Sequence, residues 1–261
     1  MKKIPQDIVG NIAILKFPRK ILNLTKRLKA RKFLKENKSI TTILEKTEKI
    51  SGNLRMGKTK HLAGEKTKET TYIENGCIFK FNVDETYFSP RLSNERKIIA
   101  DEISKIAKKQ SSKILIMFAG ISPYSIVIAK KLKEKKKKAL IISSEINKRA
   151  NIFAKKNIQL NKLQNYITLI PGDSKNLSKK TKEKFDIILM PRPNLKETFL
   201  KTALNLSKKG TIIFYHGFGK KEEVINEIKK DTKNKIGNIT IRKAGDIGPY
   251  IYRWQAKFKV K

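Results

Sequence analysis

Two carboxylate side chains and one turn of small residues stand directly after apolar runs of the kind that form buried strands. The carboxylates are Glu145 and Asp173, and the turn is Ala119-Gly120. In open α/β sheets, ligands lie beyond the carboxyl ends of the strands, so these groups should border one crevice. Glu145 could accept hydrogen bonds from ribose hydroxyls and Asp173 from an adenine amino group. The alternative is an ordinary packed turn, and the absence of Gly-Lys-Ser/Thr excludes a triphosphate cradle.

A sheet must position these groups, and apolar runs that alternate with helical patterns predict one. The pattern indicates a mostly parallel, doubly wound α/β fold. Its predicted strands are residues 114–118, 139–144, 166–170, 185–190 and 211–215, and predicted helices open at Ser122-Pro123 and span 148–160. Pro191 follows the fourth strand and should lie at the same edge.

The C-terminal residues 250–260 alternate between apolar and polar side chains. This alternation predicts a half-buried antiparallel strand with its aromatic residues in the core, and residues 239–241 are its expected partner. A parallel sheet that ends in such a hairpin is typical of class I S-adenosylmethionine-dependent methyltransferases, whereas dinucleotide-binding folds end in another parallel strand.

The N-terminal part differs in pattern, and we expect two domains with a boundary near residue 64. Residues 1–64 would form a small α+β RNA-binding or accessory domain, and residues 65–261 a Rossmann-like catalytic domain. In the first we predict strands over 8–17 and 40–48, a basic amphipathic helix over Arg19–Glu36, and a linker over 50–69. The charged helix face is either phosphate-facing or merely solvated.

Turn and capping signals order the start of the second predicted domain. Asn75-Gly76 stands between alternating runs within residues 71–89, which is a strong hairpin signal. Ser93 is the predicted N-cap of a helix over residues 94–108.

The composition indicates a polyanionic partner. Lys and Arg number 61 against 23 Asp and Glu, a net charge of +38, and cationic surfaces gain affinity for nucleic acid by releasing counterions. Compositional bias of the genome is the alternative explanation.

A single cysteine, Cys77, and two distant histidines predict neither a disulfide nor a metal site. No apolar run is long enough to span a membrane, and we expect a cytoplasmic protein.

Several stretches resemble the archaeal and eukaryotic tRNA (guanine-37-N1)-methyltransferases. They are IVGNIAILK, YIENGCIFKFNVDETYFSPRLSNER, MFAGISPYSI, KKNIQLNKL and KKGTIIFYHGFG, and the most specific is YFSPRLSNER followed by MFAG. The resemblance implies methyl transfer from S-adenosylmethionine to N1 of the guanine 3′ of the anticodon. It places cofactor contacts at Arg96, Phe118, Ala119, Gly120, Glu145, Ile146, Asp173, Ser174 and Pro191, and the substrate base at Arg91.

The chemistry of guanine agrees with a role for Arg91. The N1 proton must leave before N1 becomes a good nucleophile, and a fixed guanidinium stabilises the charge that spreads to O6. Tyr124 or Tyr87 could stack on the base, with packing as the alternative. We also place Ser89, Pro90 and Arg192 on the substrate side. No motif assigns the base that takes the proton, and Glu134 is our candidate.

The sequence departs from the family pattern at three places. Ile116 stands where the family has an acid, Ser122 replaces the second glycine of its turn, and Pro191-Arg192-Pro193 replaces Asn-Leu-Pro. Two other readings therefore stay open. One is a wyosine-pathway tRNA aminocarboxypropyltransferase or methyltransferase, although Pro90-Arg91 argues against aminocarboxypropyl transfer. The other is a degenerate RNA-binding protein without cofactor affinity.

The resemblance also bears on how tRNA is gripped. Family members often carry a further N-terminal domain that reads the outer corner of tRNA, whereas here IVGNIAILK stands close to the first residue. We therefore expect the anticodon stem-loop to be bound with nonspecific phosphate attraction in place of corner recognition. We also expect a monomer.

Overall fold

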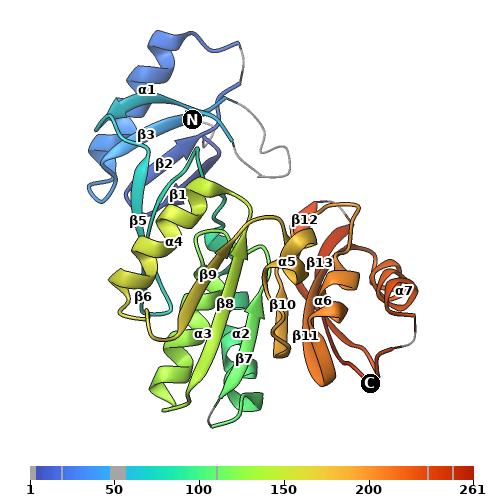
Figure 1. Cartoon of the computed structure of the whole chain (residues 1–261). Helices are drawn as coiled ribbons and strands as arrows, with labels where there is room; N and C mark the ends of the chain where they lie inside the picture. The colour runs from blue at the N-terminus through green and yellow to red at the C-terminus, as the bar shows by residue number, and fades with distance from the viewer. Residues whose placement is uncertain (1–3, 19, 48–56, 110, 234, 249) are drawn as a thin grey trace. The chain divides into compact units, whose positions relative to one another are not determined.

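The computed structural model describes residues 4–18, 20–47, 57–109, 111–233, 235–248 and 250–261. The chain divides into two compact units, Met1–Pro90 and Arg91–Lys261, which are described separately (Figure 1). The boundary expected near residue 64 falls inside the first unit. There Thr70 ties the following hairpin back to the N-terminal strands, because its Oγ1 donates to the carbonyl oxygen of Val9 at 2.9 Å.

The first unit contains a four-stranded sheet, one helix and a separate hairpin. The sheet has the order β1-β2-β3-β4, and β5 and β6 pair antiparallel. The elements are β1 (Gln6–Val9), β2 (Ile12–Leu15), α1 (Asn23–Glu36), β3 (Thr42–Lys46), β4 (Thr59–Gly64), β5 (Glu69–Glu74) and β6 (Cys77–Asn82). The predicted hairpin at Asn75-Gly76 is confirmed, and both turn residues have positive φ, 49° and 67°.

Two predictions for the first unit are wrong. The single strand over 8–17 is a hairpin, because Gly10 at φ +57° turns the chain tightly between β1 and β2. Of the predicted linker over 50–69, residues 50–56 lie outside the described residues, and the rest contains β4, which pairs with β3.

The packing of α1 also differs from its apolar pattern. Leu24 and Leu28 are 71% and 57% exposed, whereas Lys26 and Ala30 are buried. Lys26 turns inward because its Nζ lies 2.6 Å from the carboxylate of Glu45 on β3. Arg19, where we expected the helix to begin, lies outside the described residues, and α1 begins at Asn23.

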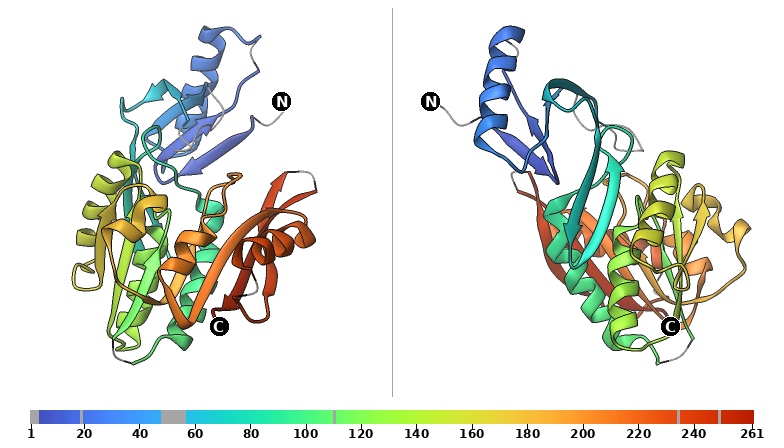
Figure 2. Two further views of the ribbon diagram at one scale, coloured as in Figure 1. Left: turned by 45° about the vertical axis from the view of Figure 1, so that its right-hand side comes forward. Right: turned by 90° about the vertical axis from the view of Figure 1, so that its left-hand side faces the viewer.

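The second unit is a seven-stranded sheet between two layers of helices (Figures 1 and 2). Its strand order is β12-β13-β11-β10-β7-β8-β9, parallel from β11 to β9, with β13 antiparallel to both neighbours. The strands are β7 (Ser112–Ile116), β8 (Ala139–Glu145), β9 (Ile167–Pro171), β10 (Phe185–Met190), β11 (Ser207–Gly219), β12 (Thr240–Gly248) and β13 (Ile251–Lys259). The predicted methyltransferase-type architecture is confirmed.

Helices contact each other in two groups, α2 with α3 and α6 with both α5 and α7. The helices are η1 (Pro90–Leu92), α2 (Ser93–Ile106), α3 (Pro123–Glu134), α4 (Lys148–Leu160), η2 (Ser174–Asn176), α5 (Leu177–Lys180), α6 (Leu200–Asn205) and α7 (Lys221–Thr232). Ser93 is not the N-cap that we predicted. The 3₁₀ turn η1 runs directly into α2, so Leu92 takes that position without a side-chain hydrogen bond.

The C-terminal strand β13 is buried on both faces at its centre. Ala256 and Phe258 are 0% and 2% exposed, as the apolar pattern predicts. Arg253 and Gln255, on the face that the alternation marks as polar, are also buried, at 6% and 3% exposed. The half-buried prediction is therefore wrong for this stretch, because β13 is flanked by β11 and β12 and its polar face turns toward α2.

Among the described residues, no helix is long and apolar enough to cross a membrane. No group of three or more His, Cys, Asp or Glu side chains in that part of the chain could hold a metal ion.

Candidate active site

The carboxyl edge of the parallel strands carries a turn with an unusual backbone. Three alternate residues after β7 have positive φ: Phe118 at 56°, Gly120 at 56° and Ser122 at 65°. For a residue with a Cβ, this left-handed backbone conformation costs about 1 to 2 kcal/mol, and residues with such strain cluster at ligand sites. The turn then opens α3, with Pro123 at its first position. The sequence predicted the turn but not its repeated left-handed conformation.

Glu145 at the tip of β8 ties this turn to the next helix. Its Oε2 accepts from the Gly120 N–H at 2.8 Å and its Oε1 from the Asn147 N–H at 2.8 Å. Burial raises the pKa of Glu145, and backbone hydrogen bonds from Asn147, Gly120 and Ile146 oppose this effect. A carboxylate has about four lone-pair positions, so these three bonds leave Glu145 about one position for a ribose hydroxyl.

The tips of β9 and β10 lie at the same edge. The Gly172 N–H donates to the carbonyl oxygen of Glu145 at 2.8 Å, and Asp173 caps η2 by accepting from the Lys175 N–H at 2.9 Å. Lys175 Nζ also lies 2.5 Å from Glu197 Oε2. Glu197 belongs to the segment that follows β10.

The residues that follow β7 contact both β10 and the start of α6. The Met117 N–H donates to the carbonyl oxygen of Leu189 on β10 at 3.0 Å. The ring of Phe118 meets that of Phe199, the residue before α6, edge to face with 4.8 Å between the ring centres. The structure therefore brings the predicted cofactor residues from Phe118 to Gly120, Glu145 with Ile146, Asp173 with Ser174, and Pro191 to one edge of the sheet.

A second cluster at this edge was missed from the sequence as a site. Glu95, in the first turn of α2, is 5% exposed. Its Oε2 and Oε1 accept from Arg242 Nη1 and Nη2 at 2.7 and 2.9 Å, and Oε1 lies 3.2 Å from His216 Nε2. His216 stands one position beyond Tyr215, which pairs with Met190, the last residue of β10. The carboxylate therefore lies at the level of the strand tips.

Charge and burial compete in this cluster. Burial raises the pKa of Glu95, but hydrogen bonds and charge from His216 and Arg242 outweigh it, and the pKa lies below its ordinary value. Burial lowers the pKa of His216, although Glu95 opposes this shift. The lowered pKa keeps Glu95 ionised near neutral pH. An ionised carboxylate only accepts hydrogen bonds, so the His216 Nε2–H donates to it.

Two predicted site residues flank this cluster. Tyr124, in the first turn of α3, is 4% exposed, and its ring lies edge to face with that of His216 at 6.0 Å. The Arg96 guanidinium, 2% exposed, lies 6.0 Å from the centre of the Tyr124 ring. Such burial leaves little of the Tyr124 face for stacking on a base, so packing against His216 accounts for it better.

One predicted residue, Glu134, is not brought to the strand tips. Glu134 ends α3, about 16 Å along the helix axis from Pro123 at 1.5 Å per residue. It therefore lies toward the opposite edge of the sheet from Gly120. Arg91 is exposed in η1 and opens the second unit, whereas Ser89 and Pro90 close the first.

Arg192 is a buried structural residue, 2% exposed, in place of the substrate contact that we predicted. Its guanidinium donates to the carbonyl oxygens of His216, Leu195 and Glu197 at 3.1, 2.7 and 3.1 Å, and to Glu227 Oε1 at 2.5 Å. These bonds hold the chain that leaves β10.

Unpaired buried hydroxyls support a ligand at this edge. Ser122 and Ser144, 0% and 1% exposed, have Oγ atoms without a hydrogen-bond partner among the described residues. Buried hydroxyls are normally paired, so a polar ligand beside the turn would satisfy them. Together with the Glu145 carboxylate and the left-handed turn, they fit the nucleoside and amino-acid parts of S-adenosylmethionine.

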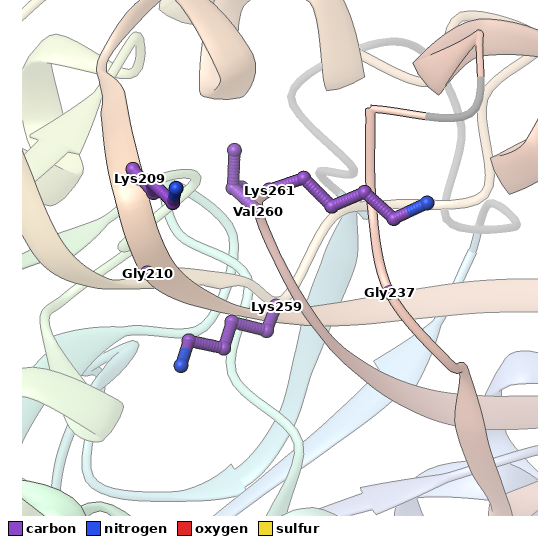
Figure 3. Close-up of a pocket in the computed structure, with 6 residues that line it drawn as sticks. All are labelled: Lys209, Gly210, Gly237, Lys259, Val260 and Lys261. Carbon is purple, nitrogen blue, oxygen red and sulfur yellow. The ribbon is translucent and has the colours of Figure 1, made fainter.

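A pocket of about 570 Å³ lies elsewhere in the second unit (Figure 3). It is lined by Lys209, Gly210, Gly237, Lys259, Val260 and Lys261. Gly210 stands near the start of β11 and Lys259 ends the antiparallel β13, so this pocket is at the amino edge of the parallel strands. It is separate from the strand tips.

Comparison with known proteins gives a consistent result. A family model described as the TRM5/TYW2 methyltransferase domain matches residues 70–240. The tRNA (guanine(37)-N(1))-methyltransferase Trm5b of Pyrococcus abyssi is 35% identical over 82% of this chain and 59% of its own length. The tRNA (guanine(37)-N(1))/4-demethylwyosine(37)-methyltransferase Taw22 of Nanoarchaeum equitans is 34% identical over 95% of this chain and 96% of its own.

Solved structures agree with these relatives. The complex of aTrm5 with tRNALeu superimposes with a TM-score of 0.83 at 25% identity, covering 99% of this chain and 72% of that one. The crystal structure of Trm5b from Pyrococcus abyssi gives 0.78 at 31% identity, covering 98% and 75%. The chain spans only 59% and 48% of the Pyrococcus abyssi and Methanocaldococcus jannaschii Trm5b sequences. On the strength of the family match and the strand-tip geometry, the chain belongs to the TRM5/TYW2 methyltransferase family.

Proposed function

We propose that this chain transfers a methyl group from S-adenosylmethionine to N1 of guanine 37 in tRNA. The observation that carries the proposal is the placement, at one edge of the sheet, of the left-handed turn at 118–122 and the buried ionised carboxylate of Glu95. The first fits a nucleoside cofactor, and the second fits a group that removes a proton. The names of the relatives from Pyrococcus abyssi and Nanoarchaeum equitans supply the substrate.

The proposed cofactor site uses the residues around the turn. Glu145 would bind a ribose hydroxyl, Asp173 the adenine amino group, and Ser122 and Ser144 the polar ends of the ligand. Arg96, Ile146, Ser174 and Pro191 would surround it. Bound S-adenosylmethionine supplies an electrophilic methyl group on a positively charged sulfur.

Glu95 replaces Glu134 as our candidate for the general base. It is a buried carboxylate at the level of the strand tips, in the YFSPRLSNER motif and one turn after Arg91, whereas Glu134 lies at the far end of α3. We propose that Glu95 accepts the N1 proton while the Arg91 guanidinium stabilises the charge that develops on O6. The base must leave its stack to reach these groups.

The partner is proposed to be the anticodon stem-loop of tRNA, bound by a cytoplasmic monomer. The net charge of +38 supports an RNA partner. In the first unit, α1 presents exposed basic side chains that we assign to phosphate contacts: Arg27, Lys29, Arg31, Lys32 and Lys35. A monomer would show a mass near 30.0 kDa by light scattering.

The test is identification of the modified nucleoside. The protein is incubated with S-adenosylmethionine and tRNA transcripts that carry guanine or adenine at position 37, and the digested RNA is analysed by mass spectrometry. We expect 1-methylguanosine from the first transcript alone. Its absence, together with no calorimetric binding of S-adenosylmethionine at millimolar concentration, would instead favour a non-catalytic RNA-binding protein.

A second candidate activity is methylation of 4-demethylwyosine at the same position. The observation that favours it is the Nanoarchaeum equitans relative, which carries both activities in its name and matches over 96% of its length. The test supplies tRNA that contains 4-demethylwyosine in place of guanine 37. Methylation of this tRNA at a rate near that of guanine would establish a dual substrate range, and methylation of guanine alone would exclude it.

A further inference from the structure

Three residues on the C-terminal strands form one row across the sheet. His216 of β11 pairs with Gln255 of β13, which pairs with Arg242 of β12. Directly opposed residues of neighbouring strands project from the same face. The row faces α2, where Arg242 and His216 both contact Glu95. The pairing registers of β11 with β13 and of β13 with β12 therefore decide where the two donors to this carboxylate lie.

The contacts of Glu95 leave one acceptor position open. A carboxylate offers about four lone-pair positions, two on each oxygen. Oε1 uses both of its positions, for Arg242 Nη2 and His216 Nε2, whereas Oε2 uses one, for Arg242 Nη1. The bidentate fork of the guanidinium fixes the plane of the carboxylate as well as its charge. A proton from a substrate would therefore reach the remaining position on Oε2.

We propose that Arg242 is the positioning residue for the general base, holding Glu95 so that one lone pair of Oε2 faces the substrate. This inference rests on the proposed function and deepens it. His216 completes the arrangement from the other side by occupying Oε1. The C-terminal hairpin, more than 140 residues along the chain from Glu95, thereby becomes part of the catalytic apparatus.

The surroundings of Glu95 determine the expected pH dependence. His216 on β11 and Arg242 on β12 contact Glu95, and the charge of Glu95 acts on Tyr124 of α3. Around them, Arg253 on β13 acts on both Tyr124 and His216, Arg96 on α2 acts on Tyr124, and Glu102 on α2 lies 3.9 Å from Arg242 Nε. Loss of Arg242 removes a cause that lowers the pKa of Glu95, and burial, which raises it, remains. A base works only when deprotonated, so activity falls as pH falls through this pKa. Without Arg242 that fall must begin at a higher pH.

The matched variants are Arg242→Gln and Lys243→Gln. Both remove one positive charge from β12, but Lys243 is the next residue of the strand and pairs with Asp246. Single-turnover methylation is measured from pH 5 to 9 with saturating RNA, and S-adenosylmethionine binding by calorimetry. The acidic limb is the part of the pH profile in which the rate falls as pH falls. For Arg242→Gln we expect a rate at least about 10-fold lower, and a midpoint of the acidic limb that lies about one pH unit or more higher than in the wild type. Its cofactor affinity should be unchanged. Lys243→Gln should keep the wild-type limb.

Two further measurements keep the inference testable. Arg242→Lys keeps the charge but not the fork, so it should lower the rate with a smaller shift of the limb. In protein labelled with ¹³C at glutamate carboxyl groups, the resonance absent from Glu95→Gln gives the titration of Glu95 without any assay of activity.

The outcomes separate the two proposals. An unshifted limb in Arg242→Gln, or an equal shift in Lys243→Gln, would overturn the role of Arg242. If the wild-type protein makes no 1-methylguanosine, the proposed function fails. The titration of Glu95 would still decide whether Arg242 lowers its pKa.

Discussion

At the scale of single residues, Ser122 combines two unfavourable features. It adopts φ +65°, and its buried hydroxyl has no partner among the described residues. A glycine would relieve the backbone strain and remove the unpaired group, although it loses more conformational entropy on folding. The serine is therefore retained at a cost in stability, which fits a hydroxyl that meets a ligand.

We predict that Ser122→Gly raises the free energy of unfolding by about 1 kcal/mol while weakening S-adenosylmethionine binding. Urea unfolding and calorimetry measure the two effects. Ser111→Gly is the matched control, because Ser111 has φ 60° but an exposed side chain. It should gain similar stability without a change in affinity. A less stable Ser122→Gly protein would contradict the strain argument.

Arg192 shows how a side chain predicted to bind substrate can be a structural residue. It bridges β11, the segment after β10, and Glu227 on α7, and its guanidinium also lies 5.0 Å from the centre of the Tyr215 ring. Glu227 Oε1 accepts from the Tyr215 hydroxyl as well. Removal of the guanidinium would leave several buried acceptors unpaired.

Arg192→Ala should therefore lower the free energy of unfolding by about 3 kcal/mol, the lower end of the range for breaking a buried pair, since Glu227 is partly exposed. Chemical denaturation of the full chain measures this. The exposed Lys196→Ala, in the same segment, should change stability by less than about 0.5 kcal/mol. A loss for Arg192→Ala no greater than that of the control would contradict the assignment.

At the scale of elements, the apolar periodicity of the sequence predicted where helices and strands lie in the chain better than it predicted what covers their faces. The bounds of α4 and β10 agree with the apolar runs at 148–160 and 185–190. The faces of α1 and β13 were misjudged, because periodicity shows which residues share a face but not what covers it. In β13 the polar face meets Glu102 of α2 through Lys257, and in α1 a lysine is buried against Glu45.

The inward-facing Lys26 of α1 gives a test of element packing. Its side chain and that of Glu45 on β3 are 11% and 9% exposed. Breaking a buried pair strands one charge, whereas replacing both members by apolar residues is often neutral. We predict that Lys26→Met costs about 3 kcal/mol or more, and that Lys26→Met with Glu45→Leu recovers most of this loss.

Urea unfolding of both variants measures the difference, with Lys29→Met as the control on the exposed face of α1. If the double variant is no more stable than Lys26→Met alone, the pair does not determine how α1 docks on β3.

At the scale of the whole molecule, the two halves of the candidate site differ in how visible they are in the sequence. The acids and the small-residue turn follow strands directly, so topology alone predicts that they meet. Glu95 lies 121 and 147 positions from His216 and Arg242. That cluster depends on the docking of α2 against the C-terminal strands, which a single sequence does not specify.

The charge of the whole chain gives the last prediction. With +38 over 261 residues, much of the RNA affinity should come from counterion release, which has no sequence or shape preference. An anticodon stem-loop should therefore be methylated nearly as well as full-length tRNA at low salt. On both RNAs, kcat/KM should fall at least about 10-fold between 50 and 200 mM salt, because several phosphate contacts weaken together.

The measurement is kcat/KM for the two RNAs across a salt series, with S-adenosylmethionine binding as the control that salt should barely affect. A parallel decline of both RNAs supports attraction by phosphates that the stem-loop already contains. A preference for full-length tRNA above about 100-fold, roughly 2.7 kcal/mol of transition-state discrimination, would instead mean that a surface of this protein reads tRNA outside the stem-loop. The basic side chains of α1, which are exposed and belong to the first unit, would then be the first to replace by neutral residues.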